Sequence, residues 1–455
     1  MTDMQDIFDY IDANAEEYIA DLQTLVRQPS ISAQGIGLRD CAELVLTMMH
    51  RDGLDAHMHE LDGGPPVITG HMTTSQSTKT MLCYSHYDVQ PPEPLEAWTH
   101  DGPWSAKIVD GYMYGRGCSD NKSGILAFNK AAKAFMKVRG ELPVNLKFII
   151  EGEEEIGSVH LGPWVEQHTD LLEADGMHCL DGPNDSSTDL PDVDLGLKSV
   201  LFAEFIAKGA NADIHSLNFP LLPSPIWDLI KALNTLIDDN RRILIEGWYD
   251  GLYALQDEDY EILADKLDRV YLDDMRAEWG IEEFALGRDG IDALIARHYE
   301  PTANIAGIVG GYTGAGSKTI VPNEARAKMD FRLPPDLNPQ VAMKKLRTHL
   351  DQHGFEHIEI KFEASAEPPY KISVKEPMAQ AIIKAATQIF GQPPIVNGVS
   401  AEGTILKHVW IPCVLTGFAS PGANLHAPDE NISVEHYIRG IKYAALIMSE
   451  FGAIS

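Results

Sequence analysis

The stretch Ser85-His86-Tyr87-Asp88-Val89-Gln90 follows the apolar run 80–84 and precedes two prolines, Pro91 and Pro92. A short apolar run that is stopped by prolines predicts a buried strand ending in a loop. His86 and Asp88 are two residues apart, so they share a face of an extended chain. There the imidazole can bind a metal while the carboxylate fixes its tautomer. A histidine that only hydrogen-bonds its own loop explains this stretch equally well when the stretch is taken alone.

Two later apolar segments also end in residues that can bind a metal. The alternating run 144–150 leads directly into Glu151-Gly152-Glu153-Glu154-Glu155, and the run 177–180 leads into Asp181. A solvated surface is the usual explanation of such a carboxylate run, but this run ends a buried strand and is flanked by glycines. Functional residues of open α/β sheets gather beyond the carboxyl ends of the strands, so three such ends in series predict one site.

The segment 115–124, Gly-Arg-Gly-Cys-Ser-Asp-Asn-Lys-Ser-Gly, precedes a helical pattern over 125–138. Two glycines one residue apart permit a tight backbone course. The segment matches neither GxxxxGK[ST] nor GxGxxG, which disfavours a phosphate cradle. Asp120, at this turn before a helix, can offer its two carboxylate oxygens to two different cations.

Length and composition limit the class of protein. A chain of 455 residues exceeds what one hydrophobic core usually supports, so two domains are expected. The formal charge of −32 disfavours binding to nucleic acid or to an anionic membrane, which both need a cationic face. The five widely spaced cysteines predict reduced thiols and no disulfide scaffold. Neither a signal peptide nor an apolar run long enough for a membrane span is evident, so we expect a cytoplasmic protein.

Taken in order, these motifs resemble those of a di-zinc metallopeptidase family. That family includes carnosine-type dipeptidases, acetylornithine and succinyl-diaminopimelate deacylases, and carboxypeptidase G-type enzymes. The resemblance covers nearly the whole chain. The segments that carry it are 85–91, 115–124, 151–158, Leu180-Asp181-Gly182, Asp213-Ile214-His215-Ser216, Arg332-Leu333-Pro334 and His426.

The resemblance implies an α/β fold with a zinc-exopeptidase-like, three-layer catalytic domain that is interrupted by an inserted lid. The lid should be a smaller α/β sandwich through which two chains form a homodimer. We expect the catalytic domain over 1–197 and 368–455 and the lid over 198–367. The charged helical stretch over 240–300 makes this lid longer than that of the deacylases, and this length resembles the dipeptidase branch.

The resemblance also implies a ligand set for two zinc ions per subunit. Asp120 would bridge them, His86 and Asp181 would complete one site, and Glu155 and His426 the other. Asp120, Glu155 and Asp181 supply three negative charges, and a bridging hydroxide a fourth, against the four positive charges of two divalent ions. Nitrogen and oxygen ligands without thiolate suit zinc, with manganese or cobalt as alternatives.

Catalytic roles follow from the same resemblance. Glu154 lies beside a ligand but is not needed in the charge count, so it is expected to be the general base. It would take a proton from water bridging the metals and pass it to the leaving amine. Asp88 would orient His86. His215 resembles a lid histidine that reaches the partner subunit's active site and stabilises the tetrahedral oxyanion.

Substrate contacts are expected from the lid and from the segment before the last ligand. Arg332 resembles a residue that grips a substrate carboxylate. Thr319 and Asn304 resemble residues of the same pocket, although a turn residue with satisfied hydrogen bonds explains Asn304 equally well. The segment 399–404 departs from the dipeptidase pattern because it lacks the arginine often found there. We hypothesise that its Glu402 pairs with a substrate ammonium or alters which side chain is accepted, and Thr404 is also counted as substrate-binding.

One rival exists for the last metal ligand. His408 could replace His426, but Lys407 beside it and its helical context disfavour this. The function expected is a metallo-exopeptidase that hydrolyses dipeptides or small peptides. The alternative is an N-acyl-amino-acid deacylase with the same site, which the dependence of cleavage on a free amine would separate. A non-catalytic binding relative is disfavoured because Glu154 and all expected ligands are present.

Overall fold

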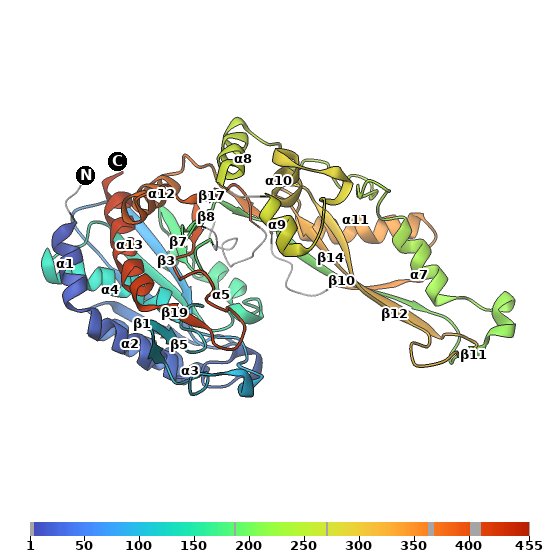
Figure 1. Ribbon diagram of the computed structural model, residues 1–455, viewed down its shortest axis with the longest axis horizontal. Helices are drawn as coiled ribbons and strands as arrows, with labels where there is room; N and C mark the ends of the chain where they lie inside the picture. The colour runs from blue at the N-terminus through green and yellow to red at the C-terminus, as the bar shows by residue number, and fades with distance from the viewer. Residues whose placement is uncertain (1–3, 186–187, 270–271, 363–367, 401–410, 455) are drawn as a thin grey trace. The chain divides into compact units, whose positions relative to one another are not determined.

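The computed structural model describes residues 4–185, 188–269, 272–362, 368–400 and 411–454. Contacts divide the chain into two units of mixed α/β structure (Figure 1). The first contains Met1–Leu195, Ile372–Asn397 and the C-terminal part of the chain, and the second contains Gly196–Lys371 and a short stretch that begins at Gly398. The second unit thus extends slightly beyond the lid expected over 198–367. It also includes the stretch at Gly398, which was expected in the catalytic domain.

The first unit is built on an eight-stranded sheet with the order β1-β2-β6-β3-β7-β18-β8-β17. The central strands β6, β3, β7 and β18 run parallel to one another, so their carboxyl ends meet at one edge of the sheet. The polar ends of three strands predicted from the sequence therefore do lie side by side. The bounds are β1 Asp55–His59, β2 Val67–Met72, β3 Thr80–His86, β6 Asn145–Glu151, β7 Gly176–Leu180, β8 Asp192–Asp194, β17 Ile395–Asn397 and β18 Cys413–Thr416.

Helices pack against this sheet, α3 on β1 and β2, α4 on β3, and α12 on β7 and β18. Residues 5–27 form two helices that meet at Asn14, whose side chain donates a hydrogen bond to the carbonyl of Tyr10 in competition with the helix backbone. The bounds are α1 Gln5–Ala13, α2 Ala15–Arg27, α3 Leu38–Arg51, α4 Lys122–Val138, α5 Leu161–Gln167, α6 Thr169–Leu172, α12 Pro377–Phe390 and α13 Val434–Ala453.

A small three-stranded sheet, with the order β19-β5-β4, completes the first unit. β4 Lys107–Val109 and β5 Tyr112–Tyr114 precede the glycine-containing segment, and β19 Asn431–Ser433 precedes α13. Antiparallel pairing of β19 with β5 therefore joins two parts of the chain that are about 300 residues apart in sequence. Each of these two parts also supplies a predicted metal ligand.

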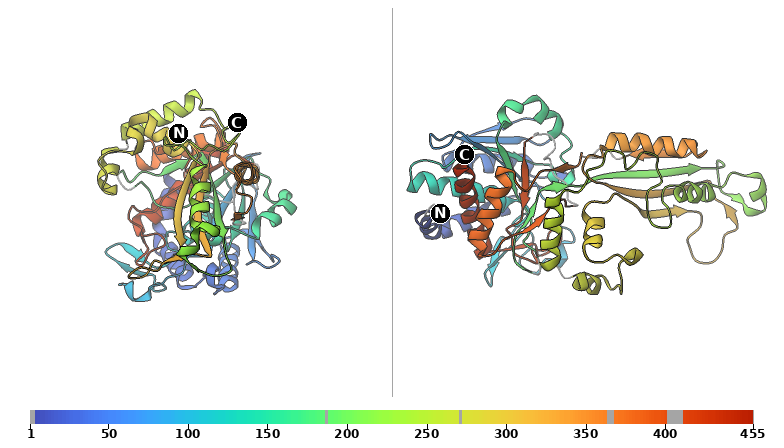
Figure 2. Two further views of the ribbon diagram at one scale, coloured as in Figure 1. Left: turned by 90° about the vertical axis from the view of Figure 1, so that its right-hand side faces the viewer. Right: turned by 90° about the horizontal axis from the view of Figure 1, so that it is seen from above.

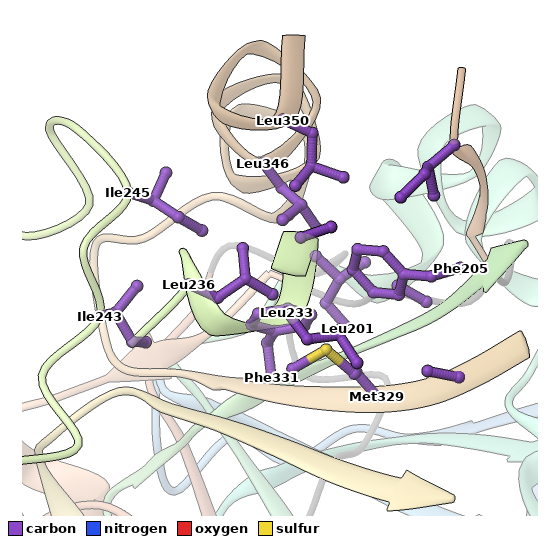
Figure 3. Close-up of a cluster of buried hydrophobic side chains, with 14 of the residues drawn as sticks. Leu201, Phe205, Leu233, Leu236, Ile243, Ile245, Met329, Phe331, Leu346 and Leu350 are labelled. Carbon is purple, nitrogen blue, oxygen red and sulfur yellow. The ribbon is translucent and has the colours of Figure 1, made fainter. Parts of the chain in front are cut away.

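The second unit is a two-layer α/β sandwich. Its antiparallel sheet has the order β12-β14-β10-β15, with β10 Ser199–Lys208, β12 Thr302–Gly310, β14 Glu324–Leu333 and β15 Glu359–Phe362. Side chains of β10 and β14 alternate between buried and more exposed, as a sheet with one covered face requires. α7 Pro225–Asn234 and α11 Pro339–Gln352 cover that face, and α11 lies along the strands (Figure 2). Leu201, Phe205, Phe331, Leu346 and their neighbours form the core between the layers (Figure 3).

In its described residues, the charged stretch 240–300 contains the helices α8 Asp257–Arg269, α9 Leu272–Trp279 and α10 Gly290–His298. Leu263, Leu272, Leu294 and Tyr299 give this addition a small core of its own. Asp259 is buried there and accepts hydrogen bonds from the hydroxyls of Tyr253 and Tyr299. In the described ranges, no helix combines the length and the apolar character that a membrane crossing needs.

Candidate metal centre

The candidate metal centre lies at the carboxyl edge of the first unit's large sheet. His86 is the last residue of β3, and Asp181 directly follows β7. Glu154 and Glu155 open a single 3-10 turn, Glu154–Ile156, just beyond β6. Asp120 comes from the loop before α4. These positions place the predicted ligands of three strands and one loop at a common edge.

Asp120 faces two separate groups of ligands. Its Oδ1 lies 3.1 Å from His86 Nε2, which is also 3.5 Å from Asp181 Oδ2. Its Oδ2 lies 3.0 Å from Nε2 of His426, which is also 3.1 Å from Glu155 Oε2. The arrangement is that of a carboxylate between two cations, with a histidine and a second carboxylate on each side.

Unsatisfied buried atoms show that these residues fit metal ions. His86 Nε2 and Asp181 Oδ1 are both buried without a hydrogen-bond partner, which native proteins rarely leave unexplained. His86, Asp120 and Glu155 each offer one ligand atom, and these atoms lie within 4.8 Å of one another. Imidazole nitrogen and carboxylate oxygen are ligands that suit divalent transition metals. A cation at each side of Asp120 would supply the missing partners.

The electrostatics of the centre favour positive charge. Burial alone would lower the pKa of His86, but the nearby carboxylates of Asp120, Asp181 and Asp88 hold that pKa well above its usual value. The hydrogen bonds of His426 with Asp120 and Glu155 raise its pKa to about 10. The carboxylates thus attract protons onto the two imidazoles, and divalent cations would satisfy the same negative potential.

Asp88 fixes the backbone that carries the glutamates. Its Oδ1 accepts the N–H of Glu154 and its Oδ2 the N–H of Glu155, both at 3.1 Å. His86 Nδ1 lies 3.1 Å from the Asp88 carbonyl and 3.4 Å from the Asp88 carboxylate. The expected support of His86 by Asp88 therefore involves the backbone carbonyl as well as the carboxylate. The carboxylate itself orders the Glu154–Glu155 turn.

Glu154 has the environment of a proton acceptor. Burial raises its pKa well above the usual range, and the neighbouring carboxylates of Asp181, Asp120 and Glu155 add to this against the opposing effect of His86. A carboxylate with a raised affinity for protons is suited to general base catalysis near neutral pH.

Two buried charged residues next to the centre were not predicted from the sequence to have a role. Arg116 and Glu430 form an ion pair at 2.7 Å, and both are at most 1% exposed. Arg116 stands between two glycines, and Glu430 follows His426 by four residues. The closeness of each to a predicted ligand was the available signal.

The expected lid residues lie in two separate places in the second unit. His215 is in β11, Ile214–His215, where its ring accepts a hydrogen bond from the N–H of Leu217, and the Thr319 carbonyl accepts the N–H of Ser216. Asn304 in β12 and Arg332 in β14 instead line one cavity of about 1000 Å³. The Asn304 side chain donates to Asp330 at 2.8 Å, so a satisfied structural role is present.

Glu402, Thr404 and the rival ligand His408 lie outside the described residues. Their expected roles stay predictions.

Comparisons with known proteins agree with this site. The sequence model of "Peptidase family M20/M25/M40" matches residues 82–450. The chain is 29% identical to the human Beta-Ala-His dipeptidase, with 99% of this chain and 93% of that protein covered. It is 26% identical to the Cys-Gly metallodipeptidase dug1 of Schizosaccharomyces pombe, with coverages of 99% and 98%. The solved structure of an M20 family metallo-carboxypeptidase from Sulfolobus solfataricus is 33% identical, covers 96% of this chain and 100% of its own, and superposes with a TM-score of 0.87.

These findings confirm the expected fold class and the expected type of enzyme, a metallopeptidase-type hydrolase. The matched region includes every predicted metal ligand, the Glu154 position and the second unit. The chain belongs to the peptidase family M20/M25/M40.

Proposed function

We propose that the chain is a di-zinc exopeptidase that hydrolyses dipeptides. The observation that carries this proposal is Asp120, whose two oxygens face two histidine–carboxylate groups at the end of one sheet. His86, Asp120 and Asp181 would hold one ion, and Asp120, Glu155 and His426 the other. Zinc suits these ligands best, and manganese or cobalt would also fit.

The chain's own residues supply the proton transfers. When bound, the ions would polarise the scissile carbonyl and lower the pKa of water. Glu154 accepts the proton of the attacking water and returns it to the leaving amine. Asp88 holds the Glu154 backbone in place through the N–H contact at 3.1 Å. No serine or cysteine nucleophile is required.

The substrate class is inferred from the relatives and from the second unit. The Beta-Ala-His and Cys-Gly dipeptidases both match nearly the whole chain, and their names describe hydrolysis of dipeptides. Arg332 would bind the C-terminal carboxylate of such a substrate from its cavity, with Asn304 beside it. The metallo-carboxypeptidase from Sulfolobus solfataricus supports a second candidate, removal of a C-terminal residue from longer peptides.

We also propose a homodimer formed through the second unit. β12 is an edge strand, and its Ile305, Ile308 and Val309 are exposed. Exposed edges of this kind pair readily with another strand. In such a dimer, His215 and Thr319 would serve the active site of the partner subunit, whereas Arg332 lies in a different part of the same unit. All five cysteines are buried and none forms a disulfide, which supports the proposed cytoplasmic location.

The test compares zinc-reconstituted protein with its Asp120→Asn variant on free dipeptides, N-acyl amino acids and longer peptides. The wild type should bind two zinc ions per chain and cleave free dipeptides, and the variant should lose both ions and the activity. Glu173→Gln is the matched control, because Glu173 is an exposed carboxylate of the same unit. Cleavage of longer peptides would favour the carboxypeptidase candidate, and cleavage of N-acyl amino acids alone would contradict both. A wild type that binds no zinc would overturn the proposal.

A further inference from the structure

We propose that the buried Arg116–Glu430 pair is a positioning device, which holds Asp120 and His426 in the arrangement that binds two metal ions. The inference rests on the proposed di-metal function and goes further, because neither residue is a ligand. In this proposal the Glu430 carboxylate joins two parts of the chain. One part supplies the bridging ligand Asp120, and the other supplies the last ligand, His426.

The Glu430 carboxylate is saturated with hydrogen-bond donors from one loop. Its Oε2 accepts the N–H of Gly117 at 2.9 Å and Nη1 of Arg116 at 2.7 Å. Its Oε1 accepts the N–H of Ser119 at 3.0 Å and that of Asp120 at 3.2 Å. Three of the four donors are backbone groups of the loop that ends in the bridging ligand. The carboxylate therefore fixes the course of that backbone at the residue whose side chain must face two cations.

Burial of both charges costs free energy unless hydrogen bonds within the protein replace those with water. Glu430 is 0% exposed and Arg116 1% exposed, so each charge is removed from water. A buried ion pair stabilises a protein only when its remaining polar atoms are satisfied. Here each oxygen of the Glu430 carboxylate has two donors, so the carboxylate side is complete. On the other side, the Arg116 guanidinium packs over the Trp98 ring, and its Nε has no hydrogen-bond partner among the described residues. Apolar side chains could fill this space at lower cost, but they could not hold three amides in a fixed orientation.

The same residue anchors the segment of His426. The Glu430 carbonyl accepts the N–H of Gly115 at 2.9 Å, and the carbonyl of Asn431 accepts the Ser119 hydroxyl at 2.8 Å. The N–H of Asn431 then bonds to the Ala423 carbonyl, which closes the segment 423–431 on itself. The C-terminal end of the His426 loop is thus tied directly to the Asp120 loop, and the other end is tied to Asn431.

The backbone of that segment needs such an anchor. Asn424, His426 and Asp429 have φ values of 54°, 57° and 57°, in the left-handed region that non-glycine residues rarely adopt. Strained positions of this kind persist only where the surroundings hold them, and they concentrate at functional sites. If the Glu430 contacts were lost, the segment could relax and His426 Nε2 would leave its place 3.0 Å from Asp120.

The test separates positioning from general stability. In Glu430→Gln the shape is kept, but one acceptor oxygen becomes an NH2 group that faces two donors. We expect the affinity for Zn²⁺, measured by competition with a chromophoric chelator, to fall about 10- to 100-fold. The matched control is Asp52→Asn. Asp52 is also buried in the first unit and pairs with the buried Lys130, but its pair is built into the helical layer between α3 and α4. That variant should lose stability in denaturant with its Zn²⁺ affinity unchanged.

Three results would overturn the inference. The first is a Glu430→Gln protein whose Zn²⁺ affinity is unchanged. The second is a Zn²⁺ affinity that falls in Asp52→Asn in proportion to the stability that this variant loses. The third applies if Glu430→Gln does not fold, and it is a Ser119→Ala protein whose Zn²⁺ affinity is unchanged. Ser119→Ala removes only the side-chain link to Asn431 and should weaken Zn²⁺ binding by a smaller factor. A wild type that binds no Zn²⁺ would instead overturn the proposed function, and the inference with it.

Discussion

The candidate metal centre of the first unit and the exposed apolar face of the second unit differ in how far their side chains find partners within the chain. At the centre, the carboxylates of Asp88 and Glu430 are each engaged by two or more backbone N–H groups. On the second unit, the β12 edge exposes Ile308 and Val309, 57% and 59% exposed, and Leu217 beside His215 is 81% exposed. All the proposed metal ligands therefore come from the first unit of a single chain. The second unit presents apolar surface that a second copy would cover.

This difference shows how the fold divides its tasks. Metal binding needs ligands held within fractions of an ångström, and buried strand ends with satisfied backbone groups provide that. Substrate binding tolerates residues that arrive from a separate body. On the proposed function, variants of the first unit should act on chemistry and metal content. Variants of the second unit should act on assembly and on the contacts that this unit makes with the substrate or the oxyanion.

The largest effect is expected for Glu154→Gln. The amide cannot accept the proton of the attacking water, so kcat should fall by about 10²- to 10⁴-fold. Because Glu154 is not a ligand in the proposed site, zinc content should stay at two ions per chain. Kinetics combined with metal analysis measure both quantities. A variant that lost zinc along with activity would show that Glu154 holds a metal ion.

A smaller loss is expected for His215→Ala, about 10²-fold in kcat if its ring stabilises the oxyanion. The variant also tests whether that ring acts in the partner subunit. In a mixed dimer of His215→Ala with Glu154→Gln, one active site combines both changes and the other contains neither. Mixing the two inactive variants should therefore restore about a quarter of the wild-type activity, since about half of the dimers are mixed. Failure to restore activity, with mixed dimers demonstrated, would place His215 in the site of its own chain.

The next prediction concerns the open edge itself. Ile308→Lys places a charge on β12, and the two-fold symmetry of a dimer would bring two such charges together at a cost of several kcal/mol. We expect monomers in sedimentation experiments at concentrations where the wild type is dimeric. Leu171→Lys is the control, because Leu171 is an exposed apolar residue of the first unit. Dissociation by both changes would show a general effect of charge, and a dimeric Ile308→Lys protein would exclude the β12 edge.

The sequence predicted much of the first unit because its signals are local. The apolar runs before His86, Glu151 and Asp181 end in polar residues, and those residues meet because β3, β6 and β7 are parallel neighbours. The break between α1 and α2 gives no such signal, because the apolar spacing continues through Asn14, where the side chain bonds to the Tyr10 carbonyl.

Residues that depend on distant contacts were harder to predict. His426 lies 306 residues from Asp120 and was assigned only by resemblance to a family. Glu430 was not identified, because closeness to His426 was its one local signal and an acidic residue in a loop looks like a solvated charge until its partners are known. Its four donors come from 116–120, on the other side of the β19–β5 pairing. Local patterns indicate which residues can bind metal, whereas the contacts that hold them in place are long-range.

The smallest effect expected is on acid stability, and it compares one buried histidine in each unit. His178 in β7 contacts the Thr416 hydroxyl at 2.8 Å, and His298 in α10 contacts the Val399 carbonyl at 2.7 Å. Burial lowers the pKa of each to about 3, below the value of an unfolded chain. Between these values the unfolded state binds more protons, so stability is lost as pH falls from about 6.5 toward about 3.

Replacing either histidine should remove its share of that loss. Going from about pH 7.5 to about pH 5, one such histidine costs about 2 kcal/mol of unfolding free energy. In His178→Gln, the unfolding free energy of the first unit should fall by about 2 kcal/mol less over this pH range than in the wild type. In His298→Gln, the same should hold for the second unit. Urea unfolding with a probe in each unit measures both changes. Metal binding also depends on pH, so the comparison is made between variant and wild type under chelation. If His178→Gln changed the acid sensitivity of both units equally, the two units would not unfold independently. The proposed difference between the metal-binding unit and the lid would then not extend to their stability.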